Sequence, residues 1–201
     1  MFLKKTFKNG FSHTLSTFTN RFVVSLRSKI KKNYSPVIKI NDLNKIPIEY
    51  LKNFKPNFVI TNACQLLSKK LIKKLKLVGA EIINIHNGIN PRYRGTGNLW
   101  AFYERNFGMT GVTLHKLDQG IDTGKIIFSK KIDFLKKNVS FEDTDTFAFC
   151  TGARLAVKYI FQQRLKNIDQ RKQNYRSRLY SYPSEEEYRK AKARFEAAKK
   201  K

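Results

Sequence analysis

Apolar and polar residues alternate along the middle of the chain in a way that separates strand-like from helix-like segments. Three short apolar runs, each typical of a buried strand, lie at 35–42, 57–63 and 80–86. Two segments with helical spacing separate them, at 47–54 and 68–77, and the second opens on the N-cap residue Ser68. The pattern therefore predicts a strand, a helix, a strand, a helix and a strand.

Similar patterns continue after residue 86. Helical spacing recurs at 98–106 and at 140–165, and residues 110–134 predict two strands joined by a glycine-punctuated loop. Strands that alternate with helices are the signature of right-handed βαβ units. We therefore expect an α/β fold with a Rossmann-like, mostly parallel sheet flanked by helices.

Both ends of the chain are basic and have helical patterns. Apolar side chains recur at helical spacing among lysines and arginines from residue 14 to residue 32. The tail opens on a capping box of Ser184 and Glu187, with acids in its first turn and lysines in its last. We therefore divide the chain into a basic helical segment at 1–34, an α/β domain at 35–165 and a basic helical tail at 166–201.

Composition adds a strong positive charge to this picture. The 201 residues suit one domain with appended helices, and the formal charge is +26. Such a charge suits nucleic acid, an anionic membrane or a phosphorylated substrate. Most of the excess is scattered lysine, which favours a solvated surface, although the arginines and tyrosines at 170–182 would also suit RNA or phosphate. Nucleic acid is therefore an alternative partner that the sequence does not favour.

Cysteine usage and hydropathy narrow the expected compartment. Cys64 and Cys150 lie far apart without metal-ligand spacing, so we expect neither a disulfide nor a metal site. No apolar run reaches about 18 residues, so no transmembrane segment is expected. The basic stretch before Asp42 resembles a mitochondrial transit peptide in composition, but a basic amphipathic helix explains it equally well and is preferred. We expect a cytoplasmic protein, with the mitochondrion as the alternative.

Polar side chains lie at the end of the third predicted strand, at 80–86. Asn84 and His86 are two apart, so they share one face of the strand, at the edge where α/β sheets bind ligands. An amide and an imidazole can both donate hydrogen bonds to an oxygen that gains negative charge, each worth about 10²–10³ in rate. Asp122, in the later glycine-rich loop, could orient the imidazole and take a proton. The three residues suit acyl transfer to an amine. Spacing alone, however, more often indicates that an Asn and a His two apart are a structural pair and that an aspartate in a glycine-rich loop only shapes the turn.

Two linked motifs carry a resemblance to a known family. "NIHNGINPRYRGTG" at 84–97 and "TGVTLHKLDQGIDTGKII" at 110–127 resemble the folate-dependent formyltransferases, which include the glycinamide ribonucleotide, methionyl-tRNA and nucleotide-sugar enzymes. The shared features are a strand-end Asn-x-His, a loop with Pro and Gly, and a strand that runs into a Gly-x-Asp-x-Gly turn. The resemblance extends from about residue 38 to residue 134.

The resemblance implies a set of site residues. Asn84 and His86 would stabilise the oxyanion at the formyl carbon, and Asp122 would orient His86 and help proton transfer. The residues implied to bind the co-substrate 10-formyltetrahydrofolate are Gln65, Leu66, Leu67, Leu117, Asp118, Gln119, Gly120 and Ile121. Those implied to face the acceptor amine are Gly88, Arg92, Tyr93 and Arg94, where the arginines either bind phosphate or belong to a solvated loop. No metal is implied.

The chain also departs from this family. Many members read Ser-Leu-Leu-Pro after the His, whereas residues 87–91 here read Asn-Gly-Ile-Asn-Pro, which leaves the acceptor open. For His115 we prefer a structural role. The family's first strand and its glycine-rich turn are not evident in the N-terminal sequence, so we expect a sheet without that strand and with extra C-terminal helices.

The motifs and the resemblance predict an N-formyltransferase that moves a formyl group from 10-formyltetrahydrofolate to a primary amine. The amine belongs to a phosphorylated or nucleotide-linked molecule, and a nucleotide-linked amino sugar is the preferred acceptor. The sequence has no room after the motifs for the extension of roughly 100 residues that tRNA-directed relatives append. The alternatives are a methionyl-tRNA or glycinamide ribonucleotide formyltransferase, a formyltetrahydrofolate hydrolase, and a truncated inactive relative acting as a basic binding protein. The oligomeric state, a homo-oligomer included, stays open.

Overall fold

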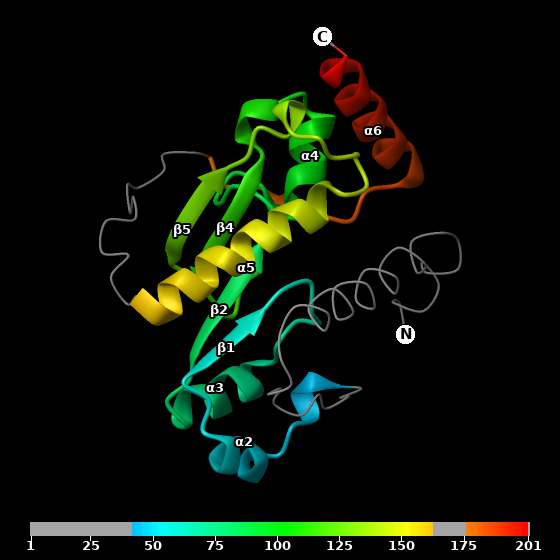
Figure 1. The fold of residues 1–201 in the computed structure, drawn as a ribbon. Coiled ribbons are helices and arrows are strands. Elements are labelled where there is room, and N and C mark those ends of the chain that lie inside the picture. The colour runs from blue at the N-terminus through cyan, green and yellow to red at the C-terminus, as the bar shows by residue number, and fades with distance from the viewer. Residues whose placement is uncertain (1–41, 163–175, 201) are drawn as a thin grey trace. The chain divides into compact units, whose positions relative to one another are not determined.

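A computed structural model describes residues 42–162 and 176–200, which form a mixed α/β fold (Figure 1). The helices are α2 (Ile48–Phe54), α3 (Lys69–Leu77), α4 (Gly97–Tyr103), α5 (Thr144–Gln162) and α6 (Glu185–Lys199). The strands are β1 (Phe58–Thr61), β2 (Glu81–His86), β3 (Arg94–Gly95), β4 (Gly111–Lys116), β5 (Ile126–Lys131) and β6 (Leu179–Tyr180). Three 3-10 turns complete the set: η1 (Leu43–Lys45), η2 (Phe107–Met109) and η3 (Phe134–Lys136). The helix expected at 14–32 lies outside the described residues, as does the strand expected at 35–42 except for Asp42.

The main sheet has the strand order β1-β2-β4-β5. The α/β class and the flanking helices are confirmed. Among the described strands, however, only β1 and β2 pair in parallel, whereas β2 with β4 and β4 with β5 pair antiparallel. The expectation of a mostly parallel sheet is therefore corrected to a mixed one for this part of the chain. For β4 and β5 the physical reason is the short loop 117–125, which returns the chain directly alongside β4 and so permits only an antiparallel pair.

Local sequence signals explain where the helices begin. The Ser68 hydroxyl accepts a hydrogen bond from the Leu71 amide at 3.2 Å, so α3 has the N-cap that its sequence predicts. Helix α6 has the predicted capping box, in which Ser184 and Glu187 satisfy each other's backbone amides. Both helix starts are thus fixed by side chains within one turn.

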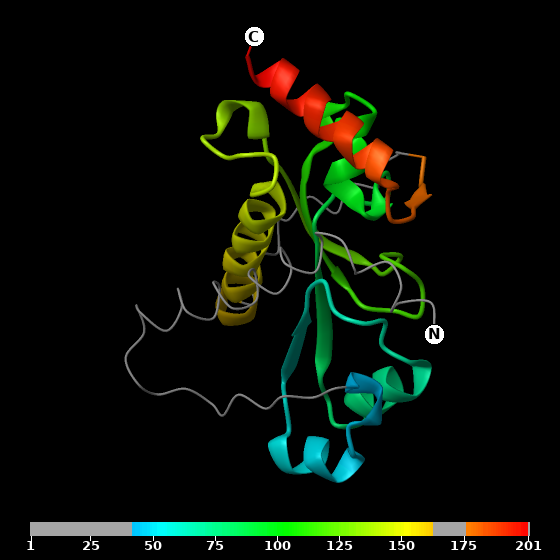
Figure 2. The ribbon, with the colours of Figure 1, turned by 90° about the vertical axis from the view of Figure 1, so that its right-hand side faces the viewer.

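The two faces of the sheet are covered by different helices. Helix α5 lies on the face of Ile85, so close that a side chain at Gly152 would collide with it. Helix α3 packs on Ile82, which points the other way because strand side chains alternate. Figure 2 shows α5 on one side of the sheet and α3 on the other. Asn84 and His86 therefore share the face of Ile82 and point away from α5.

The described part of the C-terminal tail packs onto this α/β unit. Helix α6 buries Ala191 and Phe195, and the Phe195 ring lies 5.1 Å from that of Phe102 between centroids. The division of the chain at residues 34 and 165 stays a prediction. None of the described helices is long and apolar enough to span a membrane.

Candidate active site

The three residues that the sequence singled out meet at the carboxyl end of β2. The Asn84 Nδ2 donates to Asp122 Oδ1 at 3.1 Å, and His86 Nδ1 lies 3.3 Å from Asp122 Oδ2. Asn84 and Asp122 are 38 positions apart, so only the hairpin of β4 and β5 brings the carboxylate to this strand end. The result is an amide and an imidazole, each directed at one oxygen of the same carboxylate.

Thr61, at the end of β1, fixes the orientation of the Asn84 amide. Its buried hydroxyl donates to Asn84 Oδ1 at 2.8 Å. Because the amide oxygen is held on this side, its nitrogen must face Asp122. Thr61 carries no sequence signal of its own, and its place beside Asn84 follows from the parallel register in which the two residues are partners.

His115 also belongs to the cluster, although the sequence analysis preferred a structural role for it. It pairs with Asn84 across β2 and β4, and its Nε2 lies 3.2 Å from both Asn84 Nδ2 and Asp122 Oδ1. A carboxylate can only accept and an amide nitrogen can only donate. His115 Nδ1 lies 3.0 Å from the Lys116 carbonyl oxygen and so carries a proton. His115 Nε2 therefore accepts from Asn84 when the ring is neutral and donates to Asp122 only when the ring is doubly protonated.

His86 is buried and held from both sides. Its Nε2 lies 2.6 Å from the Tyr93 carbonyl oxygen, and since a carbonyl only accepts, this nitrogen must carry the proton. Burial lowers the pKa of His86, while the charge of Asp122 opposes that change. A side chain at Gly88 would collide with this imidazole, so the glycine that departs from the family pattern makes room for it.

Asp122 is held as an anion in a tight turn. Its backbone has the left-handed φ of 52°, and the amide of Gly95 donates to its Oδ2 at 2.9 Å. Asn90 Nδ2 donates to its carbonyl oxygen at 3.1 Å. Burial raises the pKa of Asp122, but the hydrogen bond from His115, the charge of His86 and the Gly95 amide outweigh it and lower the pKa to about 2. The carboxylate is therefore ionised at neutral pH.

The loops expected to bind the folate are shaped by their own contacts. The Gln65 side chain accepts from the Leu43 amide and donates to Asp42, and Asp118 accepts from Gly120 and Thr123 in the manner of an Asx-turn. These side chains therefore have protein partners.

Two apolar side chains of the same loops stay open to solvent. Leu67 and Leu117 pack in one cluster with α3, whereas Leu66 is 70% exposed and Ile121 is 39% exposed. An exposed apolar residue on each loop fits the flat, apolar faces of a pterin, so the residues present are compatible with a folate.

The residues expected to face the acceptor are also engaged within the protein. Arg92 lies 3.5 Å from Glu104, and Arg94 donates to the Ile121 carbonyl at 3.4 Å. Tyr93 has no exposed surface, so its side chain is not accessible to an acceptor in this structure. Gly88 approaches His86 closely. A phosphate group on an acceptor would therefore compete with Glu104 for Arg92.

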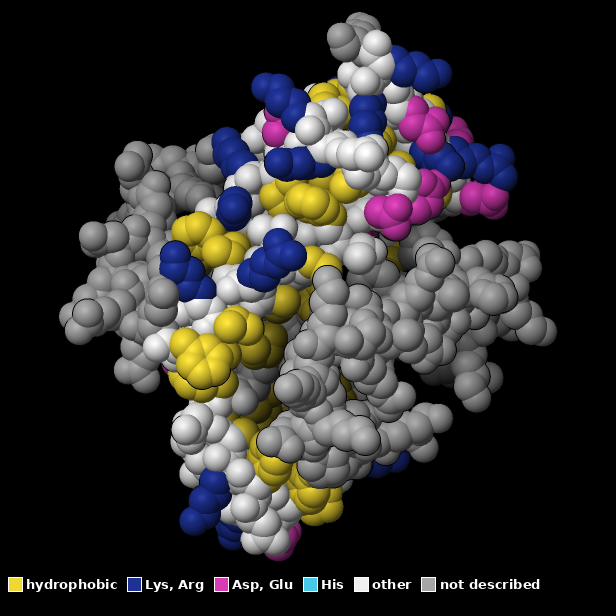
Figure 3. Space-filling view, in the orientation of Figure 1, with side chains coloured by type: hydrophobic (Ala, Val, Ile, Leu, Met, Phe, Trp, Pro, Cys, Tyr) yellow, Lys and Arg dark blue, Asp and Glu magenta, His cyan; other side chains and the backbone are white. Residues whose placement is uncertain are grey.

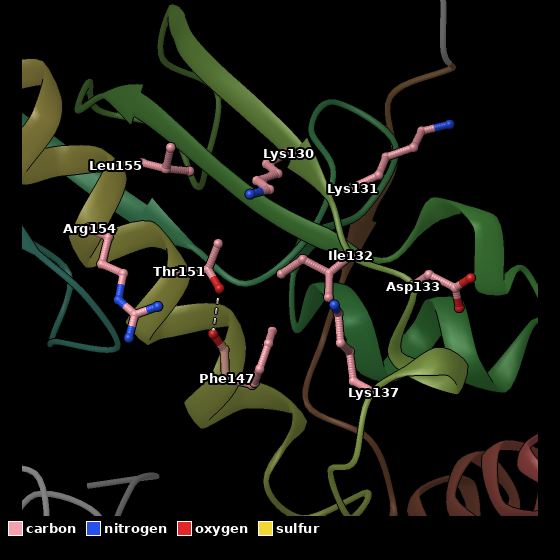
Figure 4. A pocket seen from close by; sticks show the side chains of 9 residues that line it. All are labelled: Lys130, Lys131, Ile132, Asp133, Lys137, Phe147, Thr151, Arg154 and Leu155. Carbon is pink, nitrogen blue, oxygen red and sulfur yellow. Dashed lines mark hydrogen bonds between the residues drawn. The ribbon is translucent and has the colours of Figure 1, made fainter.

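A separate hollow of about 420 Å³ opens on the α5 face of the sheet. Figure 4 shows its lining: Lys130, Lys131, Ile132, Asp133, Lys137, Phe147, Thr151, Arg154 and Leu155. Lys130 pairs with Val112, which contacts α5, whereas Asn84 and His86 point to the other face. This hollow therefore lies apart from the catalytic cluster.

Comparison with known proteins gives a consistent result. The family model described as formyl transferase matches residues 25–147. The chain is 33% identical over 128 residues to the methionyl-tRNA formyltransferase of Orientia tsutsugamushi (strain Boryong), which covers 63% of this chain and 39% of the relative. The chain thus spans less than half the length of this curated relative.

Solved structures of low sequence identity share the fold. A sugar N-formyltransferase from Shewanella sp. has a TM-score of 0.55 and 16% identity, over 93% of this chain and 85% of its own. The formyltransferase PseJ from Anoxybacillus kamchatkensis, solved with a formamido UDP-sugar and tetrahydrofolate, has a TM-score of 0.51 and 23% identity, over 86% and 84%. Because the family model covers more than half of the sequence, the chain belongs to the formyl transferase family.

Proposed function

We propose that the chain transfers a formyl group from 10-formyltetrahydrofolate to a primary amine. The observation that carries this proposal is the cluster in which the Asn84 amide and the imidazoles of His86 and His115 surround the ionised carboxylate of Asp122. Nitrogen donors held in a buried site can stabilise negative charge on a carbonyl oxygen. The Asn84 nitrogen donates to Asp122, so a formyl oxygen has to take the place of this acceptor.

The residues divide the chemistry between charge and proton. Asn84 Nδ2 is the best-oriented donor to the formyl oxygen, because Thr61 holds the amide oxygen on the opposite side. A carboxylate whose pKa is about 2 is a weak base, so Asp122 acts mainly through its charge. His86 Nδ1 can hold the proton that the attacking amine loses, since the resulting cation lies 3.3 Å from Asp122. It can return this proton to N10 of the folate as the bond between N10 and the formyl carbon breaks, which releases tetrahydrofolate.

The co-substrate supplies an activated formyl carbon that an amine can attack without a covalent enzyme intermediate. The loops that carry Leu66 and Ile121 would hold its pterin through apolar contact. PseJ, which shares the fold, was solved with tetrahydrofolate, and this supports the assignment of the co-substrate.

For the acceptor we propose a nucleotide-linked amino sugar. The Shewanella and Anoxybacillus sugar enzymes share the fold over 93% and 86% of this chain. Methionyl-tRNA is the second candidate, because the Orientia relative carries that name. Both acceptors present a primary amine, so the cluster serves either. A cytoplasmic location stays a prediction.

The reaction can be tested with 10-formyltetrahydrofolate and a panel of UDP- and dTDP-linked amino sugars, glycinamide ribonucleotide and methionyl-tRNA, following the release of tetrahydrofolate. We expect release that depends on an amino sugar. Asn84→Ala should lower the rate by about 10²–10³ because it removes a donor to the developing charge, and Asp122→Asn should abolish transfer.

Matched controls separate these roles from general damage. Asn53→Ala and Asp133→Asn make the same changes at exposed positions and should leave the rate unchanged. Calorimetric titration with tetrahydrofolate should still detect binding to both site variants. Full activity in either site variant would refute the assigned roles, and formate release without any amine would instead identify a hydrolase.

A further inference from the structure

A short C-terminal segment lies directly against the loop that follows His86. We call Arg178–Ser181 the C-terminal strap. Its backbone pairs with β3, where the Arg94 amide donates to the Arg178 carbonyl at 3.1 Å and the Arg178 amide donates to the Pro91 carbonyl at 3.2 Å. Trp100 Nε1 adds a hydrogen bond to the Ser181 carbonyl at 2.9 Å. The strap is therefore held along its whole length.

Glu104, at the end of α4, joins the strap to the loop. Its Oε1 accepts from the Tyr180 hydroxyl at 2.6 Å, and its Oε2 accepts from the Tyr93 hydroxyl at 2.8 Å. Arg178 adds an ion pair at 3.2 Å and Arg92 a longer one at 3.5 Å. Although burial raises the pKa of Glu104, the hydrogen bonds from the two tyrosines outweigh it and lower the pKa, so the side chain stays charged.

Aromatic contacts reinforce this junction. The Tyr180 ring stacks on Tyr93 at 5.4 Å and on Trp100 at 5.2 Å between centroids. Tyr93 and Tyr180 are both buried. One carboxylate and three stacked rings thus connect three segments: the loop, helix α4 and the strap.

The loop held in this way contacts two members of the catalytic cluster. The Tyr93 carbonyl binds His86 Nε2 at 2.6 Å, and the Gly95 amide donates to Asp122 Oδ2 at 2.9 Å. Gly95 has a φ of 81°, and the Tyr180 carbonyl lies so close that a side chain at Gly95 would collide with it. Displacement of the strap would therefore move the backbone groups that hold His86 and Asp122.

We infer that Glu104 is a positioning residue of the active site, which through Tyr93 and Tyr180 clamps the strap onto the loop that binds His86 and Asp122. The inference rests on the proposed function for its effect on rate. The effect on His86 itself does not depend on that function. A displacement of about 1 Å in a catalytic group can cost about 10²-fold in rate, so a clamp two contacts away has a measurable effect.

Tyr180→Phe tests the clamp with the smallest change, because it removes the hydroxyl bound to Glu104 and keeps both ring stacks. Tyr159→Phe, on α5, is the matched control, because it removes a hydroxyl that binds Glu81 at 2.9 Å and leaves the hydrogen bonds of Glu104 in place. We expect Tyr180→Phe to lower kcat by about tenfold with little change in KM, and the control to leave both unchanged.

A second measurement reads the position of His86 directly. Nitrogen-15 spectra of the histidine side chains report the tautomer of His86 and the exchange rate of its Nε2 proton. We expect faster exchange of this proton in Tyr180→Phe and in Glu104→Gln, and an unchanged rate in Tyr159→Phe. This measurement needs no substrate, so it decides the inference even if the wild-type protein transfers no formyl group.

The inference is overturned if Tyr180→Phe retains both the wild-type kcat and the wild-type exchange of the His86 proton. It is also overturned if Tyr159→Phe changes these quantities as much as Tyr180→Phe does, since the effect would then follow from lost stability alone. Should Glu104→Gln fail to fold, Tyr180→Phe alone decides.

Discussion

At the scale of residues, the cluster is ordered by a strict match of donors and acceptors. Asp122 can only accept, and it accepts from the Asn84 amide and the Gly95 amide, while a nitrogen of His86 and one of His115 lie within 3.3 Å of it. Asn84 could present either end of its amide to this carboxylate, and Thr61 decides which. The hydroxyl of a strand residue thereby determines the direction in which a catalytic donor points.

Replacement of Thr61 should expose this dependence. Thr61→Val keeps the shape but leaves Asn84 Oδ1 without its donor, so we expect a loss of about 1–3 kcal/mol in the free energy of unfolding and a several-fold lower kcat. Thr61→Ser keeps the hydroxyl and should behave like the wild type in both. Denaturant unfolding and the tetrahydrofolate release assay measure the two effects. Equal rates in the Val and Ser variants would show that Thr61 does not orient the amide.

Sequence alone predicted only part of this cluster. Asn84 and His86 could be placed together because a strand repeats every two residues, and Asp122 could be added through the family motif. Thr61 and His115 could not be assigned, because their proximity to Asn84 depends on the registers of β1 and β4 against β2. Register between segments follows from packing and not from the pattern within either segment.

At the scale of elements, helix α6 is an integral part of the core. Its sequence predicts a well-capped, highly charged helix, and the capping box is present. What the pattern did not indicate is that Phe195 is only 1% exposed and packs against Phe102 and Phe141. A highly charged helix near the C-terminus therefore covers one end of the main hydrophobic cluster.

Phe195→Ala should accordingly destabilise the whole unit. Removal of a buried phenylalanine costs about 3–5 kcal/mol, through lost burial and the cavity that remains. Val157→Ala, at a position on α5 that is 51% exposed, should change the free energy of unfolding by less than about 0.5 kcal/mol. Urea unfolding followed by circular dichroism measures both. A loss below about 1 kcal/mol in Phe195→Ala would mean that α6 is not part of the cooperative core.

At the scale of the whole molecule, positive charge is spread over the surface. Figure 3 shows Lys and Arg dispersed over the visible described face, with the acidic side chains gathered mainly beside α6. The hollow between β5 and α5 contains several of these cations but lies on the sheet face opposite the cluster. Cations dispersed in this way over the described face favour general attraction to polyanions over one built recognition site.

Nucleic-acid binding should therefore be weak and strongly salt-dependent. We expect a mixed-sequence RNA oligonucleotide to bind at low salt, with an affinity that falls steeply and linearly in a log–log plot as salt increases, and without preference for sequence. Filter binding over a salt series measures this. Tight, sequence-selective binding at physiological salt would instead favour the alternative of a basic binding protein.

Local sequence predicted the described helices and strands except β3 and β6, the N-caps of α3 and α6, the shared face of Asn84 and His86, and the resemblance that family membership confirmed. These features follow from interactions within a few residues or from motifs that are contiguous. The tertiary structure decided the mixed strand pairing, the addition of Thr61 and His115 to the cluster, and the contact of the strap with the catalytic loop. Each of these joins segments distant in sequence, and only the packing of the folded chain sets which distant groups meet.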